Sequence, residues 1–231
     1  MKLLAKLSAF VPLAMTLVWL QFLPDRIPVH YAADGTVNGW GSKWESLLLP
    51  GITILMAVLF SLAGLLLRRK AGTDEKARAH TESNCRILRI VLLGSVLLFT
   101  VLQVVLLLGA GRGAAEDGAK TAEVPFLKIT AIGLAFLFIL MGNLMPKSRM
   151  NSSVGFRCGW SMYNENTWRR SNRFGGWALT AAGLVTIPAA LLAPEPWPLP
   201  ICLGALLAAL VASLVYAKKV YREEKGINNE Y

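Results

Sequence analysis

Histidine and cysteine are scarce in this 231-residue sequence, which contains two histidines and three cysteines. The cysteines, Cys85, Cys158 and Cys202, are too few and too scattered to form a disulfide framework. None of them belongs to a redox or metal-binding motif. These absences exclude a disulfide-rich secreted scaffold and a cysteine-based metal centre.

Charged residues make up only 16% of the sequence and are missing from long stretches of it. Four stretches contain none, and residues 174–217 contain only Glu195. Apolar residues make up 55% and the mean hydropathy is +0.49, so these stretches match the roughly 20 apolar residues that a membrane-spanning helix needs. We therefore predict an all-α, polytopic integral membrane protein, and a sizeable soluble core is excluded. The six predicted transmembrane helices cover residues 5–23, 46–67, 87–109, 125–145, 175–193 and 199–217.

The predicted spans lack ionisable residues near the centre of the membrane, which removes the usual signature of proton relays and ion-coupled transporters. Gln103 is the most polar residue deep in a span, and we expect it to form an interhelical hydrogen bond rather than to bind a ligand. Small residues recur at four-residue spacing in the last span, which predicts close helix packing. These residues are Gly204, Ala208 and Ala212, beside Ala205, Ala209 and Ser213.

The formal net charge of +10 is unevenly distributed along the chain. When the N-terminus is placed inside the cell, 19 of the 24 basic residues fall on the inner side. This asymmetry follows the positive-inside rule and predicts that both termini face the cytoplasm. Membrane topology thus accounts for the basic charge, and direct nucleic-acid binding is not expected.

Four segments follow from this topology. Residues 1–67 form an N-terminal two-span region, residues 68–86 a cytoplasmic linker, residues 87–217 a four-span region and residues 218–231 a cytoplasmic tail. The linker is highly charged, and we expect it to extend the adjacent helices as a helical hairpin. The second outer loop, residues 109–123, is small and polar, which predicts flexibility.

The first outer loop, residues 24–45, is rich in proline and glycine and is predicted to be a structured, turn-rich cap rather than a helix. His30 and Asp34 have side chains that could share a metal ion or a proton. The competing interpretation is a folded turn, which we prefer because the outer side offers no second histidine and no cysteine. We predict no metal and no cofactor. The candidate ligand-binding or partner-binding residues of this loop are Pro28, His30, Asp34, Gly35 and Lys43.

The second inner loop, residues 147–173, interleaves arginines with aromatic residues. Its guanidinium groups can pair with lipid phosphate, with Glu165 or with an acidic partner, and its tryptophans suit the membrane interface. Asn164 is predicted to be a helix N-cap, and Gly155 is predicted to form a turn that aims Arg157 at carbonyls or at Glu165. Simple anchoring and a specific structural or partner role both remain open. The candidate residues are Asn151, Gly155, Arg157, Trp160, Asn164, Trp168 and Arg173.

Both loops resemble known sequence elements. Residues 143–175 resemble the signature of the SdpI family, membrane proteins named for immunity to the sporulation-delaying peptide toxin. The outer loop is similar to a DUF1648-like domain often found ahead of that signature, through Ile27-Pro28-x-His30, Gly35 and Gly41-Ser42-Lys43. Cys158-Gly159 departs from the Thr-Pro that usually follows the family's arginine. The matching signature residues are Asn143, Pro146, Asn151, Gly155, Arg157, Trp160, Ser161, Asn164, Trp168 and Gly175.

The resemblance implies a non-enzymatic, multi-pass protein of the inner (plasma) membrane that confers immunity to a secreted peptide toxin. It also implies a link to a cytoplasmic transcriptional repressor, so the expected partners are the lipid bilayer, the toxin and that repressor. An enzyme is disfavoured because His30 lies outside and His80 inside, where they cannot cooperate. A transporter or exporter of a hydrophobic peptide or lipid is the alternative, since the absence of charge at the membrane centre does not exclude a hydrophobic cargo.

Overall fold

The computed structural model describes residues 3–31, 37–72, 74–113 and 126–226. The N-terminal helical segment consists of α1 (Leu3–Leu7), the 3-10 turn η1 (Ser8–Phe10) and α2 (Val11–Trp19). Two strands, β1 (Arg26–Tyr31) and β2 (Val37–Ser42), and the 3-10 turn η2 (Lys43–Leu47) follow. The remaining elements are α3 (Leu48–Ala71), α4 (Glu75–Gly113), α5 (Phe126–Leu144), η3 (Met145–Lys147), α6 (Glu165–Leu192) and α7 (Pro198–Glu224).

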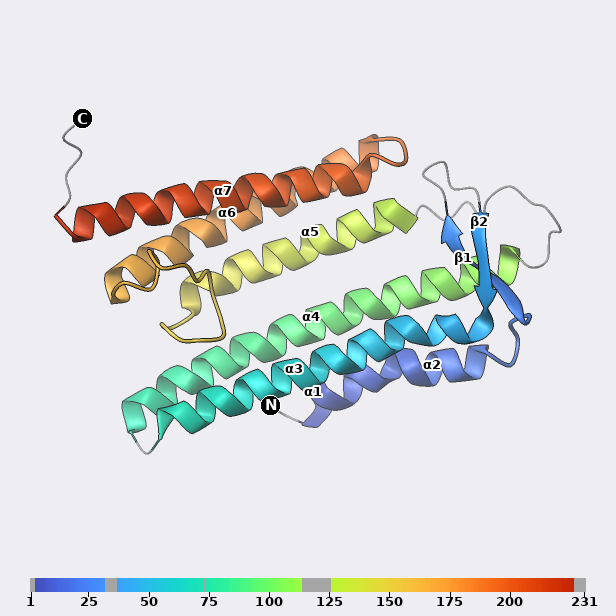
Figure 1. Cartoon of the computed structure of the whole chain (residues 1–231), viewed down its shortest axis with the longest axis horizontal. Helices are drawn as coiled ribbons and strands as arrows, with labels where there is room; N and C mark the ends of the chain where they lie inside the picture. Colours follow the sequence, from blue (N-terminus) through green and yellow to red (C-terminus); the bar gives the residue numbers. More distant parts are fainter. Residues whose placement is uncertain (1–2, 32–36, 73, 114–125, 227–231) are drawn as a thin grey trace.

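The helices run along one common axis in two adjacent groups (Figure 1). Helices α1 to α4 form one group and α5 to α7 the other, and α4 packs against α5 between them. We call the end with the two strands and the α6–α7 turn the hairpin end. The opposite end holds the α3–α4 turn and the connection between α5 and α6, and we call it the loop end (Figure 1).

Helix α6 packs closely against α5 because glycines leave room for the two backbones to meet. A Cβ atom on Gly176 would lie 2.5 Å from the carbonyl oxygen of Gly142. A Cβ atom on Gly183 would lie 2.5 Å from the carbonyl oxygen of Ala135. Small residues allow this approach in membrane helices, where van der Waals contact between helices replaces hydrophobic burial as the driving force.

Five helical segments are long and apolar enough to cross a membrane: Lys43–Ala71, Ala77–Gly111, Phe126–Lys147, Glu165–Leu192 and Pro198–Glu224. The span predicted over residues 5–23 corresponds to a shorter apolar helical segment, Leu3–Trp19. Its helix changes to a 3-10 turn just before Pro12, whose ring removes a backbone donor, and it ends in a turn after Trp19. The protein is therefore helical and suited to multiple membrane crossings, with one short and five long helices in the part described.

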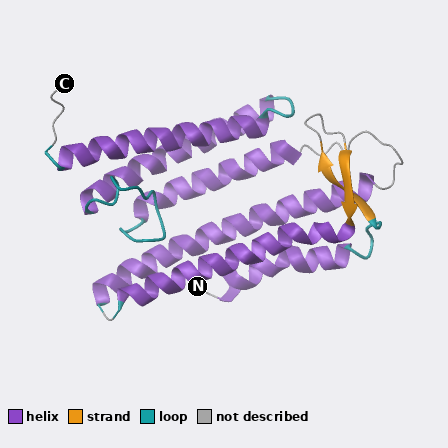
Figure 2. Cartoon of the chain, viewed as in Figure 1, coloured by secondary structure: helices purple, strands orange, loops and turns teal. Residues whose placement is uncertain are grey.

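The expectation of an all-α fold is wrong at the first outer loop, where the chain forms an antiparallel β-hairpin (Figure 2). Ile27 pairs with Gly41 and Pro28 with Trp40. Strand β1 has a β-branched or aromatic residue at every second position, Ile27, Val29 and Tyr31, and a two-stranded sheet tolerates Pro28 because both strands are edges. Ile27 is buried and packs in a cluster with Leu107 of α4, so the hairpin covers that end of the helix.

The charged segment at residues 68–86 is helical on both sides of a short turn, as predicted. Helix α3 continues to Ala71, Gly72 adopts a positive φ of 57°, and α4 begins at Glu75. At the other end of α4 the helix continues to Gly113, and the rest of the loop predicted to be flexible lies outside the described residues.

Gln103 forms the interhelical hydrogen bonds predicted for it. Its amide Nε2 donates to the Thr16 hydroxyl at 2.8 Å and to the Ser46 carbonyl at 2.9 Å. Gln103 is 1% exposed, and these bonds satisfy its buried amide N–H groups, whereas its Oε1 has no hydrogen-bond partner within the described chain. One polar residue of α4 thereby fixes α2 and the start of the α3 segment around it.

Candidate functional site

The best-defined polar structure in the described chain is the connection between α5 and α6, residues 145–164, which we call the α5–α6 loop. Trp168, in the first turn of α6, is 3% exposed and anchors this loop. Its indole Nε1 donates to the carbonyl of Ser148 at 3.0 Å. The tryptophan therefore fastens the start of the loop to the start of α6, an internal role that interfacial anchoring alone does not require.

Asn164 caps α6, as the sequence predicted. Its side-chain oxygen accepts from the Thr167 backbone N–H at 2.8 Å, and the Thr167 hydroxyl accepts from the Asn164 N–H at 3.0 Å. This reciprocal capping box satisfies backbone groups that the first helical turn leaves unpaired. The cap explains why α6 begins at Glu165, well before the predicted start of the span at residue 175.

Gly155 forms the turn that the sequence predicted, with a φ of +106° that strongly favours glycine. A Cβ atom here would lie 2.5 Å from Oδ1 of Asn172 and 2.8 Å from Cζ2 of Trp168. Because the loop backbone at Gly155 lies close to α6, Oδ1 of Asn172 in α6 accepts from the Phe156 N–H at 2.7 Å. Its Nδ2 donates to the Trp168 carbonyl at 3.1 Å, so one buried amide joins loop to helix.

Asn151 organises the first half of the loop. Its Oδ1 accepts from the N–H groups of Ser153 and Val154, both at 2.7 Å, which is a tight side-chain-capped turn. Its Nδ2 donates to the Val154 carbonyl at 3.0 Å. Asn151 therefore sets the backbone path that leads into the Gly155 turn.

Asn84, on α4, holds the loop from the other helix group. Its Oδ1 accepts from the Arg149 N–H at 3.0 Å, and its Nδ2 donates to the Arg149 carbonyl at 3.2 Å. The side chain is 2% exposed. This two-way clamp is a direct polar connection between the two helix groups at the loop end.

The three remaining predicted residues of the α5–α6 region face the surface. Arg157 is exposed and donates through Nη1 to the Ser152 carbonyl, whereas no ion pair joins it to Glu165 among the described residues. The aromatic ring of Trp160 lies 5.7 Å from the ammonium of Lys218, and Arg173 lies 5.8 Å from the ring of Trp177. The loop and the adjoining parts of α6 and α7 therefore display cations and aromatic rings around a hydrogen-bonded interior.

The end of α7 completes this surface. Glu224 accepts hydrogen bonds from Asn164 Nδ2 at 3.1 Å and from Asn166, and Arg170 pairs with Glu223 at 2.8 Å. These contacts join the start of α6 to the end of α7 at the loop end. The predicted site thus includes a helix terminus that the sequence had not linked to the loop.

The hairpin end holds the other candidate residues. Nδ1 of His30 is hydrogen-bonded to Oδ1 of Asn38, so this histidine is engaged within the hairpin. Lys43 pairs with Asp25 at 2.9 Å, and the nearby ammonium lowers the pKa of that carboxyl. Asp34 and Gly35 lie outside the described residues. No group of three potential metal-ligating side chains occurs in the described part of the chain.

Several residues that shape the loop were not among the predicted site residues. Asn172 accepts from the loop backbone at Phe156, and the Ser148 carbonyl accepts from the Trp168 indole. Asn84 donates to the loop backbone at Arg149 from α4, a helix far away in sequence. Ser161 accepts from the Cys158 N–H at 2.9 Å and donates to the Phe156 carbonyl at 2.9 Å. Ser161 matched the SdpI signature, which was a usable signal, while nothing local in the sequence marks Asn84.

Comparison with known proteins identifies two matching family models. Residues 7–54 match a domain of unknown function, DUF1648, and residues 147–217 match the SdpI/YfhL protein family. Across 215 residues, 91% of each chain, the sequence is 23% identical to the immunity protein SdpI of Bacillus subtilis strain 168. No solved structure matches.

The first match contains the hairpin, and the second begins at the end of η3 and contains most of the α5–α6 loop together with α6. These are the two places where the sequence motifs pointed. The chain therefore combines a DUF1648 domain with a region of the SdpI/YfhL protein family.

Proposed function

We propose that this chain is a non-enzymatic membrane immunity protein that protects its cell against a secreted antimicrobial peptide toxin. The observation that carries the proposal is the similarity, along 91% of both chains, to a protein named immunity protein SdpI. The geometry of the α5–α6 loop supports it, because the buried polar side chains there bond to the backbone and are not arranged around a reacting group.

The hairpin is the proposed contact for the toxin. Val29, Trp40 and Trp44 are 40%, 49% and 60% exposed, which places large apolar side chains on the surface of a small, internally bonded structure. Exposed aromatic surface of this kind suits the apolar face of an amphipathic peptide. Pro28, His30 and Lys43 would then act by fixing the shape of the hairpin.

The α5–α6 loop is the proposed contact for a cytoplasmic partner, in line with the placement of basic loops on the inner side. Arg157 and Tyr163 are exposed on this loop beside the partly buried Trp160, and Arg173 is exposed on the adjoining part of α6. Guanidinium groups next to aromatic rings recognise acidic protein surfaces. A transcriptional repressor held at this surface would link toxin exposure to gene expression.

Survival of a toxin-sensitive bacterium that expresses the chain tests the immunity proposal. We expect wild-type protein to raise survival against a pore-forming amphipathic peptide, and Trp40→Ala with Trp44→Ala to reduce the protection. Trp197→Ala, at the other turn of the same end and 59% exposed, is the matched control and should remain protective. Equal loss in the control would mean that the tryptophans act only as interfacial anchors.

A photo-cross-linking amino acid at Tyr163 tests the partner proposal in living cells. Tyr163 is 49% exposed on the proposed partner surface, and Leu207, 61% exposed on α7, is the control position. We expect a soluble DNA-binding protein to be cross-linked from position 163 and not from 207. Cross-links from position 163 to lipid alone would contradict a partner role.

A further inference from the structure

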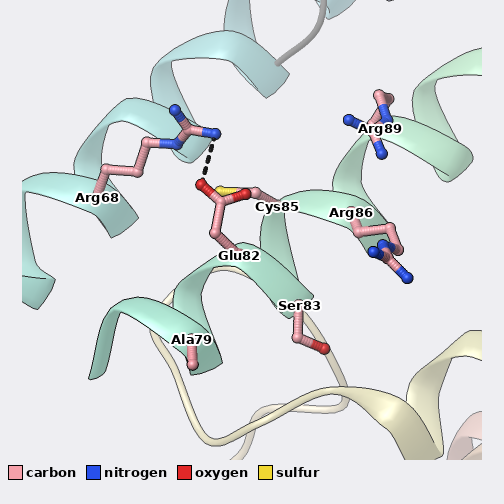
Figure 3. A pocket seen from close by; sticks show the side chains of 7 residues that line it. All are labelled: Arg68, Ala79, Glu82, Ser83, Cys85, Arg86 and Arg89. Atoms are coloured by element: carbon pink, nitrogen blue, oxygen red, sulfur yellow. Dashed lines mark ion pairs between the residues drawn. The ribbon is translucent and has the colours of Figure 1, made fainter. Parts of the chain in front are cut away.

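Two hollows at the loop end meet at Arg68. The first, of about 430 Å³, lies between α3 and α4 and is lined by basic residues that include Arg68, Arg86 and Arg89 (Figure 3). The second, of about 450 Å³, runs between the N-terminal helical segment and α3 and is also lined by Arg68. We call them the basic pocket and the apolar groove.

The basic pocket carries an excess of positive charge. Arg68 pairs with Glu82 at 3.0 Å, and Figure 3 shows these two side chains turned toward each other. Arg86 and Arg89 make no hydrogen bond or ion pair within the described part of the chain. Three guanidinium groups against one carboxylate leave two positive charges uncompensated, so the pocket favours an anion.

The depth of the pocket places it in the headgroup layer of a membrane. The uncharged stretch of α3 ends directly before Arg68, and the uncharged stretch of α4 begins directly after Arg89. Residues that end apolar stretches lie where the hydrocarbon meets the phosphates. Basic pockets between transmembrane helices at this depth bind the phosphates of anionic lipids.

The apolar groove supplies a place for a hydrocarbon chain. Phe10, Val58, Leu62 and Leu65 are among the residues that line it. Lys6 and Arg68 also line it, so the groove pairs an apolar wall with two cations. A free phosphate would use only the basic pocket, whereas a phospholipid would use both hollows.

We propose that this region binds one anionic phospholipid, with its phosphate near Arg68, Arg86 and Arg89 and an acyl chain in the apolar groove. The bound lipid would fill the space between the N-terminal segment, α3 and α4. This role is independent of toxin immunity, because none of the residues involved belongs to the hairpin or to the α5–α6 loop.

Native mass spectrometry of the purified full chain in detergent tests the proposal, with phosphatidylglycerol as the probe and phosphatidylcholine as the neutral comparison. We expect wild-type protein to retain phosphatidylglycerol selectively. Arg86→Gln with Arg89→Gln should weaken that binding by about tenfold or more. Arg69→Gln with Lys147→Gln removes the same charge from exposed positions at the same end and should change it by less than about twofold.

Two further variants separate the contributions of the pocket and the groove. Glu82→Gln removes the opposing carboxylate from a side chain that is 67% exposed, so it should strengthen phosphatidylglycerol binding. Val58→Trp fills the groove from a position that is 48% exposed and should weaken binding of the lipid. Opposite signs in these two variants are hard to produce by misfolding.

Three results would overturn the proposal. One is equal loss in the Arg86/Arg89 and Arg69/Lys147 double variants, which would indicate non-specific surface charge. Another is unchanged binding in Glu82→Gln and Val58→Trp. The third is full displacement of phosphatidylglycerol by equimolar inorganic phosphate, which would identify the pocket as a site for a free anion.

Discussion

At the scale of single residues, the α5–α6 loop is held by side chains that bond to backbone rather than to each other. Trp168 and Asn172 contribute from α6, Asn84 from α4 and Asn151 from within the loop. Each of the four satisfies backbone groups that have no regular secondary structure to pair with. Removing one such side chain leaves its backbone partner without that hydrogen bond. The loss of stability should be larger than for removing a hydrogen bond at the exposed surface.

Gly155→Ala tests this packing most simply. The substitution should destabilise the loop by about 1–3 kcal/mol, because the backbone φ is +106° and the added Cβ would lie 2.5 Å from Oδ1 of Asn172. Hydrogen exchange of the loop amides should accelerate accordingly. Gly159→Ala is the matched control, since nothing lies within 4 Å of its Cβ position. Similar exchange rates in the two variants would contradict the account of the Gly155 turn.

Arg157 makes one of the two kinds of contact that the sequence predicted for it. The sequence favoured a guanidinium aimed at carbonyls or at Glu165, and the structure gives a bond to the Ser152 carbonyl from an otherwise exposed side chain. Most of the guanidinium therefore remains accessible to a partner. Its conformational contribution is smaller than those of the buried Trp168 and Asn172.

At the scale of elements, the start of α6 depends on a cap that also reaches another helix. Asn164→Ala should lower the stability of the first turn by about 1 kcal/mol, because the Thr167 N–H loses its acceptor. Hydrogen exchange of the amides at residues 165–168 measures this effect.

Asn166→Ala is the control for that measurement. It removes a hydrogen bond to Glu224, as Asn164→Ala does, but leaves the capping box intact. Fraying of the first turn in both variants would assign the effect to the contact with α7 instead of to the cap.

The elements that could be predicted were those with a strong local signal. Long uncharged runs identified the five long helices, Asn164 marked the start of α6, and the charged segment after residue 68 continued as helix. The hairpin was missed because its prolines and glycines resemble a turn, whereas its strands are stabilised by pairing and by Ile27 packing on α4. Packing between residues far apart in the sequence, such as Ile27 and Leu107, leaves little trace in a single sequence.

The last helix shows the same limit. Two rows of small residues in α7 predicted close packing. In the row of Ala205, Ala209 and Ser213, the last two residues are buried, as are Cys202 and Ala217 on the same helix. The row of Gly204, Ala208 and Ala212 is exposed. Periodicity identified a helix face suited to packing, yet it could not determine which of two adjacent faces meets α6.

At the scale of the whole molecule, the two ends of the bundle have different chemistry. Both ends present aromatic residues, but the loop end presents most of the arginines and lysines of the described chain. This polarity supports the proposed orientation, with the loop end in the cytoplasm. The toxin contact and the partner contact would then lie on opposite sides of the membrane.

Reporter fusions test that orientation directly. A reporter active only outside the cytoplasm should be active when fused after Gly113 or after Gly35, because the topology predicted from the sequence places both in outer loops. It should be inactive after Ala71 or Ser152 at the loop end. Activity at Ser152 would place the α5–α6 loop outside and remove the basis for a cytoplasmic partner.

The proposed immunity protects the cell without destroying the toxin. The most direct measurement follows cell survival and the intact peptide together, by mass spectrometry of the medium and cells of a protected culture. We expect survival to rise above that of the empty-vector strain while the amount of intact peptide stays equal in both cultures. Unchanged survival would contradict immunity, and loss of intact peptide that requires the expressed chain would instead indicate an enzyme.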